Sequence, residues 1–196
     1  KLLPYLNYIK NNIITSPVSH FDETSVKING KIHWLHVAST KHATYYDVHT
    51  KRGNIAMNAI GILPNIRGIA IHDYWKPYMN YYQCRHALCN AHHLRELEFI
   101  YERTNKTWAK QMINLLLRTN QIVSAYKARG KEGLPSKTIA CVEKRYDQII
   151  KIFFNETPID DYTVRSKWSK AEIRGENLGE RFRLKRHLVL GFMRDF

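Results

Sequence analysis

Long apolar runs and a cysteine framework are both missing from this chain of 196 residues. No apolar segment approaches the roughly 18 residues that cross a membrane, which argues against a membrane protein. The first residues lack the compact apolar core and small-residue cleavage site of a secretory signal. Cys84, Cys89 and Cys141 form an odd set without the spacing of a disulfide framework, so we expect a reducing, cytoplasmic environment.

Acidic side chains are also few, with 17 Asp and Glu against 31 Lys and Arg, for a net charge of +14. This balance favours a polyanionic partner, because each phosphate that a basic side chain neutralises releases counterions. A basic but otherwise inert surface is the alternative. An anionic membrane is disfavoured, since no helix pairs a lysine-rich face with an exposed aromatic face. Nucleic acid is therefore the expected partner.

The first half of the chain carries the patterns of a mixed α/β fold. Apolar residues spaced by three and four predict a helix over 2–14. Asn29-Gly30 predicts a type I′ hairpin, since both turn positions need positive φ. The expected strands are 18–28, 31–39, 43–48, 68–72 and 85–89, with a short helix over 57–63 before the fourth.

The second half is expected to be helical. Apolar stripes predict helices near 94–101, 109–126, 136–153 and 178–192, with Ser136 as an N-cap and a polar basic loop over 163–176. Three antiparallel strands followed by alternating helices and strands is the ribonuclease-H-like order. The expected fold class is therefore α/β, with a ribonuclease-H-like mixed sheet. In that order the first strand and the end of the fourth lie side by side.

Two aspartates occur where these two strands would bring them together. Asp22 lies within a predicted strand, where aspartate is disfavoured, and Asp73 ends a buried apolar strand. Paired carboxylates are costly unless a divalent cation neutralises them, so a shared metal site is expected. A solvated strand aspartate and a turn or cap aspartate are the plain alternatives. Glu23 should point to the opposite face and not bind the same ion.

Two-metal phosphoryl chemistry usually needs a third acid, which we expect from a late helix. Glu176 and Glu180 are the nearest late candidates. Glu180 lies three residues after Asn177, however, so it also resembles the reciprocal cap of a helix start.

A Cys-His segment follows the second aspartate. The Cys-x4-Cys-x2-His-His spacing crowds its last ligands onto one turn, which argues against zinc. A buried Cys89 with a hydrogen-bonded His92 is the plain alternative. Arg95, about one turn after His92, could bind phosphate. Trp75 and Lys76 belong to an aromatic and basic segment that either stacks on DNA bases or forms a loop packed by its own rings.

In several sequence motifs the chain resembles the transposases of the insertion-sequence-66 family, bacterial enzymes of the DDE type. The shared motifs are Phe21-Asp22-Glu23-Thr24, the hairpin with Trp34, His72-Asp73-Tyr74 with Tyr78, Cys89-Asn-Ala-His92-His93-Leu-Arg95-Glu-Leu, Tyr101-Glu-Arg-Thr, Trp108-Ala-Lys and Leu190-Gly-Phe-Met-Arg-Asp195-Phe. The aspartate-glutamate-threonine triplet alone is weak, but with the later Cys-x-x-His-x-x-Arg segment it is specific.

The resemblance implies that Asp22 and Asp73 are catalytic and bind Mg²⁺, with Mn²⁺ as a substitute, and that Cys89 and His92 support the active site or contact DNA. The resemblance also implies that the partners of the protein are transposon ends and target DNA, held by a homo-oligomer in a synaptic complex at the bacterial nucleoid. The family's third acid lies in an Asn-Asn…Glu-Arg segment that would follow Phe196, and its amino-terminal DNA-end-recognition regions would precede Lys1. We therefore expect a core without its last acid and with little activity.

The predicted organisation has four parts. They are a leading helix over 1–16, a ribonuclease-H-like catalytic core over 17–104, an all-helical insertion over 105–162, and a basic loop with the start of the carboxy-terminal part of the core over 163–196. Three rival functions stay open: a nuclease or resolvase on the same fold, a non-catalytic DNA-binding remnant, and a zinc-stabilised interaction module.

Overall fold

The computed structural model describes residues 2–157 and 168–194 and divides the chain into two compact units, 1–89 and 90–196. Each unit is described by itself. The elements of the first are α1 (Leu3–Ile14), β1 (Val18–Ile28), β2 (Lys31–Ser39), β3 (Thr44–His49), α2 (Asn54–Ile60), η1 (Leu63–Asn65), β4 (Ile69–His72), η2 (Lys76–Asn80) and β5 (Arg85–Leu88).

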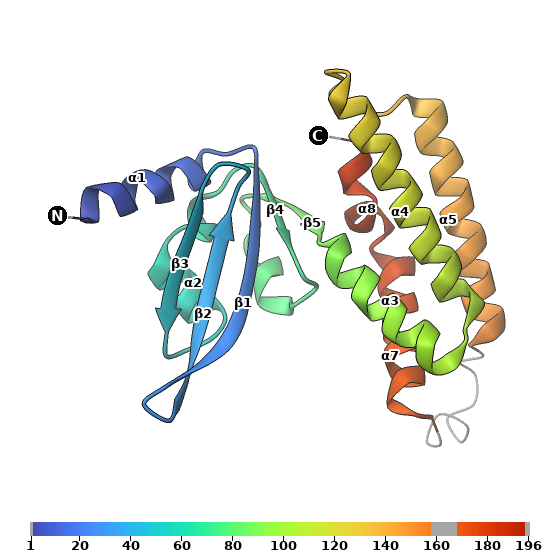
Figure 1. The fold of residues 1–196 in the computed structure, drawn as a ribbon, viewed down its shortest axis with the longest axis horizontal. Helices are drawn as coiled ribbons and strands as arrows, with labels where there is room; N and C mark the ends of the chain where they lie inside the picture. Colours follow the sequence, from blue (N-terminus) through green and yellow to red (C-terminus); the bar gives the residue numbers. More distant parts are fainter. Residues whose placement is uncertain (1, 158–167, 195–196) are drawn as a thin grey trace. The chain divides into compact units, whose positions relative to one another are not determined.

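The first unit is built on a five-stranded mixed sheet with the order β3-β2-β1-β4-β5 (Figure 1). β1 and β3 run antiparallel to β2, whereas β4 runs parallel to both β1 and β5. The chain therefore makes three consecutive antiparallel strands and then crosses over to the other side of β1. This confirms the predicted α/β class and is compatible with a ribonuclease-H-like fold.

The two faces of this sheet differ in what covers them. Phe21 pairs with Ala38, and both side chains are buried in a core that includes Met57 of α2. Asp22 pairs with Val37 one position along, and so belongs to the opposite face because successive strand residues alternate. Asp22 is exposed. Asp22 therefore lies on the face of the sheet away from α2.

Turn chemistry places most of the predicted strand ends correctly. Asn29 and Gly30 have φ angles of 50° and 75°, which confirms the type I′ hairpin. The helix predicted over 57–63 was wrong in its bounds, because α2 already begins at Asn54. It ends when Gly61 adopts the left-handed conformation, with φ 75°, a backbone state that glycine enters without steric cost.

The second unit is helical in its described part. Its elements are α3 (Asn90–Thr104), α4 (Thr107–Ala128), α5 (Ser136–Glu156), α7 (Lys170–Leu184), α8 (Arg186–Val189) and η3 (Gly191–Met193). Figure 1 shows α4 and α5 side by side, and α3 packs against both α4 and α7. The core contains Trp108, whose ring meets Phe153 at 5.2 Å between centroids, and Tyr146, whose hydroxyl donates to the Phe182 carbonyl at 2.9 Å.

Three local predictions for this unit were wrong. Ser136 is the first helical residue of α5 and not its cap, since Pro135 occupies the cap position. The loop predicted over 163–176 is helical from Lys170 on, because Ser169 and Glu172 form a reciprocal capping box. Residues 163–167 of that loop lie outside the described residues. The helix predicted over 178–192 is interrupted between α7 and α8, at Lys185.

The predicted domain boundaries after residues 16, 104 and 162, and the interpretation of the helical block as an insertion, stay predictions.

Candidate metal centre

The pairing of β1 with β4 brings the two strands that lead to the aspartates side by side. Val18 lies in register with Ile69, Ser19 with Ala70, and His20 with Ile71. Asp22 and Asp73 each follow the last of these pairs by two positions. If this register were extended by two residues, the aspartates would face each other on the same side of the sheet, although Asp73 itself lies just beyond the end of β4.

The charges of both aspartates contribute to the pKa of the Tyr78 hydroxyl. Burial raises its pKa far above the ordinary value, and the negative charge of Glu23 and the hydrogen bond to it raise the pKa further. The charges of Asp73 and Asp22 add to the same shift. Because such Coulomb effects fall with distance, both carboxylates lie within electrostatic range of one buried hydroxyl.

Backbone hydrogen bonds orient each carboxylate. Asp22 Oδ1 accepts from the N–H of Glu23 at 2.9 Å, and Asp73 Oδ1 accepts from the N–H of Trp75 at 2.9 Å. Mg²⁺ is a hard cation that proteins commonly hold through one or two carboxylates together with water and substrate phosphates. The donor set of Asp22 and Asp73 fits that chemistry. Across 2–157 and 168–194, no group of three or more His, Cys, Asp or Glu side chains is placed to hold a metal ion.

An ion pair with a buried carboxylate lies on the other face of β1. The Glu23 side chain is 2% exposed, and its Oε1 accepts from Arg52 Nη2 at 2.7 Å. The Tyr78 hydroxyl donates to Oε2 of the same carboxylate. Glu23 therefore points away from Asp22, as the alternation of side chains along a strand requires. Its hydrogen bond with Tyr78 joins β1 to the segment that follows Asp73. The signal in the sequence for this ion pair was an acidic residue on the apolar face of a strand.

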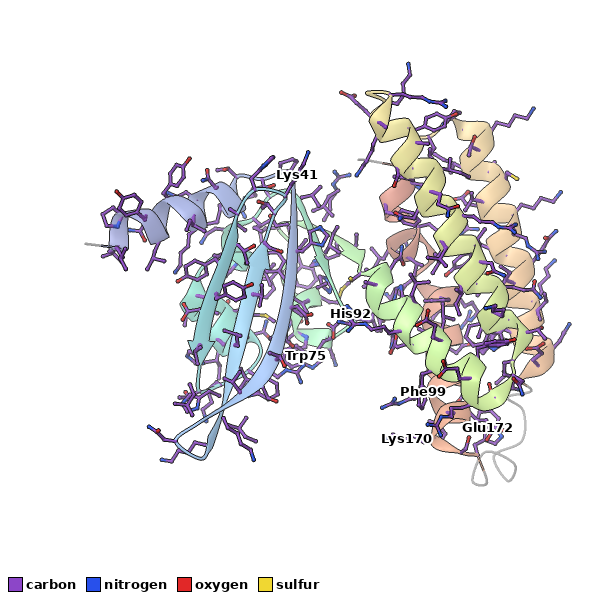
Figure 2. The ribbon with its side chains drawn as sticks, in the orientation of Figure 1. Lys41, Trp75, His92, Phe99, Lys170 and Glu172 are labelled. Atoms are coloured by element: carbon purple, nitrogen blue, oxygen red, sulfur yellow. The ribbon has the colours of Figure 1, made fainter. Side chains whose placement is uncertain are left out.

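Aromatic rings hold Arg52 in place. Its guanidinium lies 3.7 Å from the Trp75 ring centroid and 4.5 Å from that of Trp34. Trp75, labelled in Figure 2, also meets the Tyr78 ring edge-on at 6.2 Å. These contacts match the alternative of a loop packed by its own rings. Lys76 beside it is exposed. DNA contacts by Trp75 and Lys76 stay predictions.

His72, beside the second aspartate, is a buried residue that the sequence reasoning did not single out. Its ring stacks on Tyr78 at 4.5 Å, and its Nε2 lies 2.9 Å from His86 Nδ1. Burial lowers the pKa of His72 to about 4, so the ring is neutral at physiological pH. Its signal in the sequence was a polar residue ending the apolar run from Ile69.

The Cys-x-x-His segment spans the two units. Cys89 closes the first unit, where it is half-buried and donates its backbone N–H to the His72 carbonyl at 2.8 Å. His92 and Arg95 belong to α3 of the second unit, with His92 near its start (Figure 2). Arg95 is exposed, and its Nε donates to the Ala91 carbonyl at 3.3 Å.

The alternative of a buried Cys89 was wrong, because Cys89 is only half-buried. Of the cysteines and histidines between Cys84 and His93, the buried ones are Cys84 and His93. The roles of Cys89, His92 and Arg95 toward DNA or the active site stay predictions.

His93 is part of the core of the second unit. It is 1% exposed, its Nδ1 lies 3.0 Å from Asn90 Oδ1, and its ring meets Phe182 edge-on. Burial lowers its pKa to about 3, with smaller contributions from the charges of Arg181 and His92. The unfolded chain therefore binds this proton between about pH 6.5 and 3, whereas the folded protein does not.

We expect the free energy of unfolding to fall as the pH is lowered through 6.5, and His93 to supply part of the slope. Urea unfolding at pH 7 and pH 5 measures this slope. His93→Gln should show a smaller loss between the two pH values than the wild type, while a variant at the exposed His42, His42→Gln, should keep the full loss. Equal losses in all three proteins would contradict the assignment to His93.

Both late acids, Glu176 and Glu180, lie in α7 of the second unit, and a role for either as the third metal ligand stays a prediction. Asn177 and Glu180 lie inside α7, so the interpretation of Glu180 as a helix-start cap was wrong. Glu180 instead pairs with Arg183 at 2.8 Å. Glu176 is 5% exposed within the second unit.

None of the helices in the described part of the chain is long and apolar enough to cross a membrane. No curated protein and no solved structure matches the chain. A family model described as Transposase IS66 family matches residues 1–180, which is most of the sequence. The two aspartates, the strand order that joins them and the Cys-x-x-His segment all lie inside the matched region. The chain therefore belongs to the IS66 family of transposases.

Proposed function

We propose that this chain is the catalytic core of a DDE-type transposase, in which Asp22 and Asp73 are the metal-binding carboxylates. The observation that carries the proposal is the β1–β4 register, which leads to both residues on one face of the sheet. The electrostatic effect of both carboxylates on Tyr78 supports the same convergence. Family membership supplies DNA as the substrate class.

The proposed reaction has two phosphoryl-transfer steps at transposon ends. In the first, a water oxygen forms a bond to phosphorus and loses a proton to solvent, while the bond to the 3′-oxygen breaks and that oxygen takes up a proton to become a hydroxyl. In the second, the freed 3′-hydroxyl attacks a phosphodiester of target DNA and displaces that strand's 3′-oxygen. Bound Mg²⁺, or Mn²⁺ in its place, would stabilise the charge on the attacking and leaving oxygens.

The protein's own contribution is placement. Asp22 is exposed and Asp73 half-buried, so a DNA phosphate can approach the face on which they lie. Glu23 binds Tyr78 and Arg52, and thereby joins the strand of Asp22 to the loop that follows Asp73. In this proposal Glu23, Arg52 and Tyr78 are positioning residues, since none of them contacts the reacting atoms. Assembly as a homo-oligomer on paired ends at the nucleoid is part of the same proposal.

Divalent-metal binding tests the assignment without requiring turnover. Mn²⁺ titrations of the whole chain, followed by the electron paramagnetic resonance signal of the free ion, should show binding. We expect Asp22→Asn and Asp73→Asn each to weaken that binding at least about tenfold, because each removes one of two anionic ligands.

The matched control is Asp47→Asn, which changes another strand aspartate by the same charge. Asp47 lies on β3 and accepts from the Tyr45 hydroxyl at 3.1 Å. The Asp47→Asn variant should leave Mn²⁺ binding unchanged. A wild-type chain that binds no Mn²⁺, or two aspartate variants that bind it as the wild type does, would refute the proposed centre.

A further inference from the structure

A stripe of lysines runs along the outer face of α5. Lys137, Lys144 and Lys151 are exposed and follow one another at intervals of seven residues. Seven residues rise about 10.5 Å along a helix and turn only about 20° away from two full turns. The three ammonium groups therefore belong to one face and span about 21 Å of helix.

This face lies opposite the side of α5 that enters the core. The buried residues of α5 are Val142, Tyr146, Ile149, Ile150 and Phe153. At 100° per residue, Lys144 is about 160° from both Val142 and Tyr146. The lysine stripe therefore has no packing role in its own unit.

The acids of α5 are all bound by other elements. Arg194 pairs with Glu143, and Arg186 pairs with Asp147 at 2.8 Å. Glu156 accepts hydrogen bonds from the Thr107 hydroxyl and the Trp108 N–H. By contrast, Lys137, Lys144 and Lys151 form no ion pair with any acid in the part of the chain that the structure describes.

The neighbouring helix adds no negative charge beside this face, whose nearest acid, Asp147, is paired with Arg186. α4 contains no acidic residue in its 22 positions. Gln111 of α4 accepts from Arg145 Nη2 at 2.8 Å, which fixes the side on which α4 borders α5. Arg118 follows Gln111 by seven residues, so it lies on nearly the same side of α4, and it is exposed.

We propose that the lysine stripe of α5, formed by Lys137, Lys144 and Lys151, is a docking surface for the phosphate backbone of double-stranded DNA. The surface offers point charges in a row and no donor-acceptor pattern, which suits binding that does not depend on base sequence. A DNA strand carries one phosphate per roughly 3.4 Å of axis, so a row of about 21 Å faces several phosphates. The inference rests on the proposed function for its choice of DNA among polyanions.

Salt-dependent DNA binding by the whole chain tests this surface. Fluorescence anisotropy with a labelled 30-base-pair duplex gives the association constant at several salt concentrations. The triple variant Lys137→Gln, Lys144→Gln, Lys151→Gln should bind at least about tenfold more weakly near 0.1 M salt. The slope of log K against log salt should shrink by about 2.7, because each lost phosphate contact removes about 0.9.

Two matched variants separate the surface from net charge and from misfolding. Lys27→Gln, Lys31→Gln, Lys41→Gln removes the same charge from exposed positions of the first unit and should keep most of the slope. Lys137→Arg, Lys144→Arg, Lys151→Arg keeps the charges and should bind as the wild type does.

Equal losses in the two glutamine triples would overturn the proposal, and so would an unchanged slope in the α5 triple. A wild-type chain that binds no duplex would overturn it together with DNA as the partner. A chain that binds DNA through α5 but fails the Mn²⁺ titration would leave this surface standing and remove only the metal centre. Binding of an acidic protein but not of DNA would also count against it.

Discussion

Glu23→Ala is expected to lower the free energy of unfolding by about 1–3 kcal/mol. The substitution leaves the Tyr78 hydroxyl, whose residue is 2% exposed, without its acceptor, and an unsatisfied buried donor costs about that much. The loss of the Arg52 ion pair adds less, since the Arg52 side chain is 36% exposed and water screens its charge. Urea unfolding of the whole chain at pH 7 measures the effect.

A double-mutant cycle identifies the cause. In a Tyr78→Phe background the hydroxyl is already absent, so Glu23→Ala should cost less there by about 0.5 kcal/mol or more. Glu23→Gln keeps an acceptor oxygen for Tyr78 and should cost less than Glu23→Ala. If Glu23→Ala costs the same with and without the Tyr78 hydroxyl, the hydrogen bond between them is not what stabilises the strand.

The same variants test whether the ion pair positions the candidate metal centre. Glu23 borders Asp22 in the chain, and its partner Tyr78 lies five residues after Asp73. If Glu23 positions both aspartates, Glu23→Ala should weaken Mn²⁺ binding even under conditions where the protein is fully folded, although Glu23 is not a ligand. A variant that is less stable but binds Mn²⁺ normally would reduce Glu23 to a purely structural role.

Gly179→Ala is expected to destabilise the second unit by about 1–3 kcal/mol. A Cβ atom at position 179 would lie 2.2 Å from Cε2 of Phe153, a ring with no exposed surface that also packs against Trp108. The ring cannot move away without displacing the core, and such overpacking costs about this amount. The gain in helix propensity, about 1 kcal/mol, does not offset it.

Gly175→Ala is the matched control on the same helix, one turn earlier. There the nearest atom to a new Cβ would be Cγ2 of Ile100 at 3.4 Å, which is an ordinary van der Waals contact. This variant should be as stable as the wild type or more so, because only the helix-propensity term changes. Thermal unfolding of the two variants side by side measures the contrast. Equal melting temperatures would show that Phe153 accommodates the extra carbon.

Local patterns predicted the first unit well, because each strand there is bounded by its own turn chemistry. The hairpin at Asn29-Gly30 sets the register of β1 and β2, and both strands have the predicted bounds. The amino-terminal helix begins one residue later than predicted and ends at Ile14, before Ser16-Pro17. In these segments backbone preference and hydrophobic period agree, so tertiary contacts have little to override.

Prediction was weakest where helix signals compete with polar composition. The segment after Ser169 is rich in charge and was predicted as a loop, although α7 begins at Lys170. Its capping box was present in the sequence as Ser-x-x-Glu, so the signal existed and was outweighed by composition. Its buried face includes two glycines and Glu176, which hides the apolar period that a sequence pattern depends on.

By itself, the sequence determined that Asp22 and Glu23 face opposite sides of a strand, because side chains alternate along any extended backbone. It also determined the family, since the motifs are local strings of residues. Only the tertiary structure decided what Glu23 meets: Arg52 is 29 residues away in the chain and Tyr78 is 55. Contacts at such separations depend on how strands pair and which face is covered, and no local periodicity encodes them. The pairing of the acids beside the lysine stripe of α5 arose in the same way, because an arginine from α8 binds Asp147 and one from the segment after η3 binds Glu143.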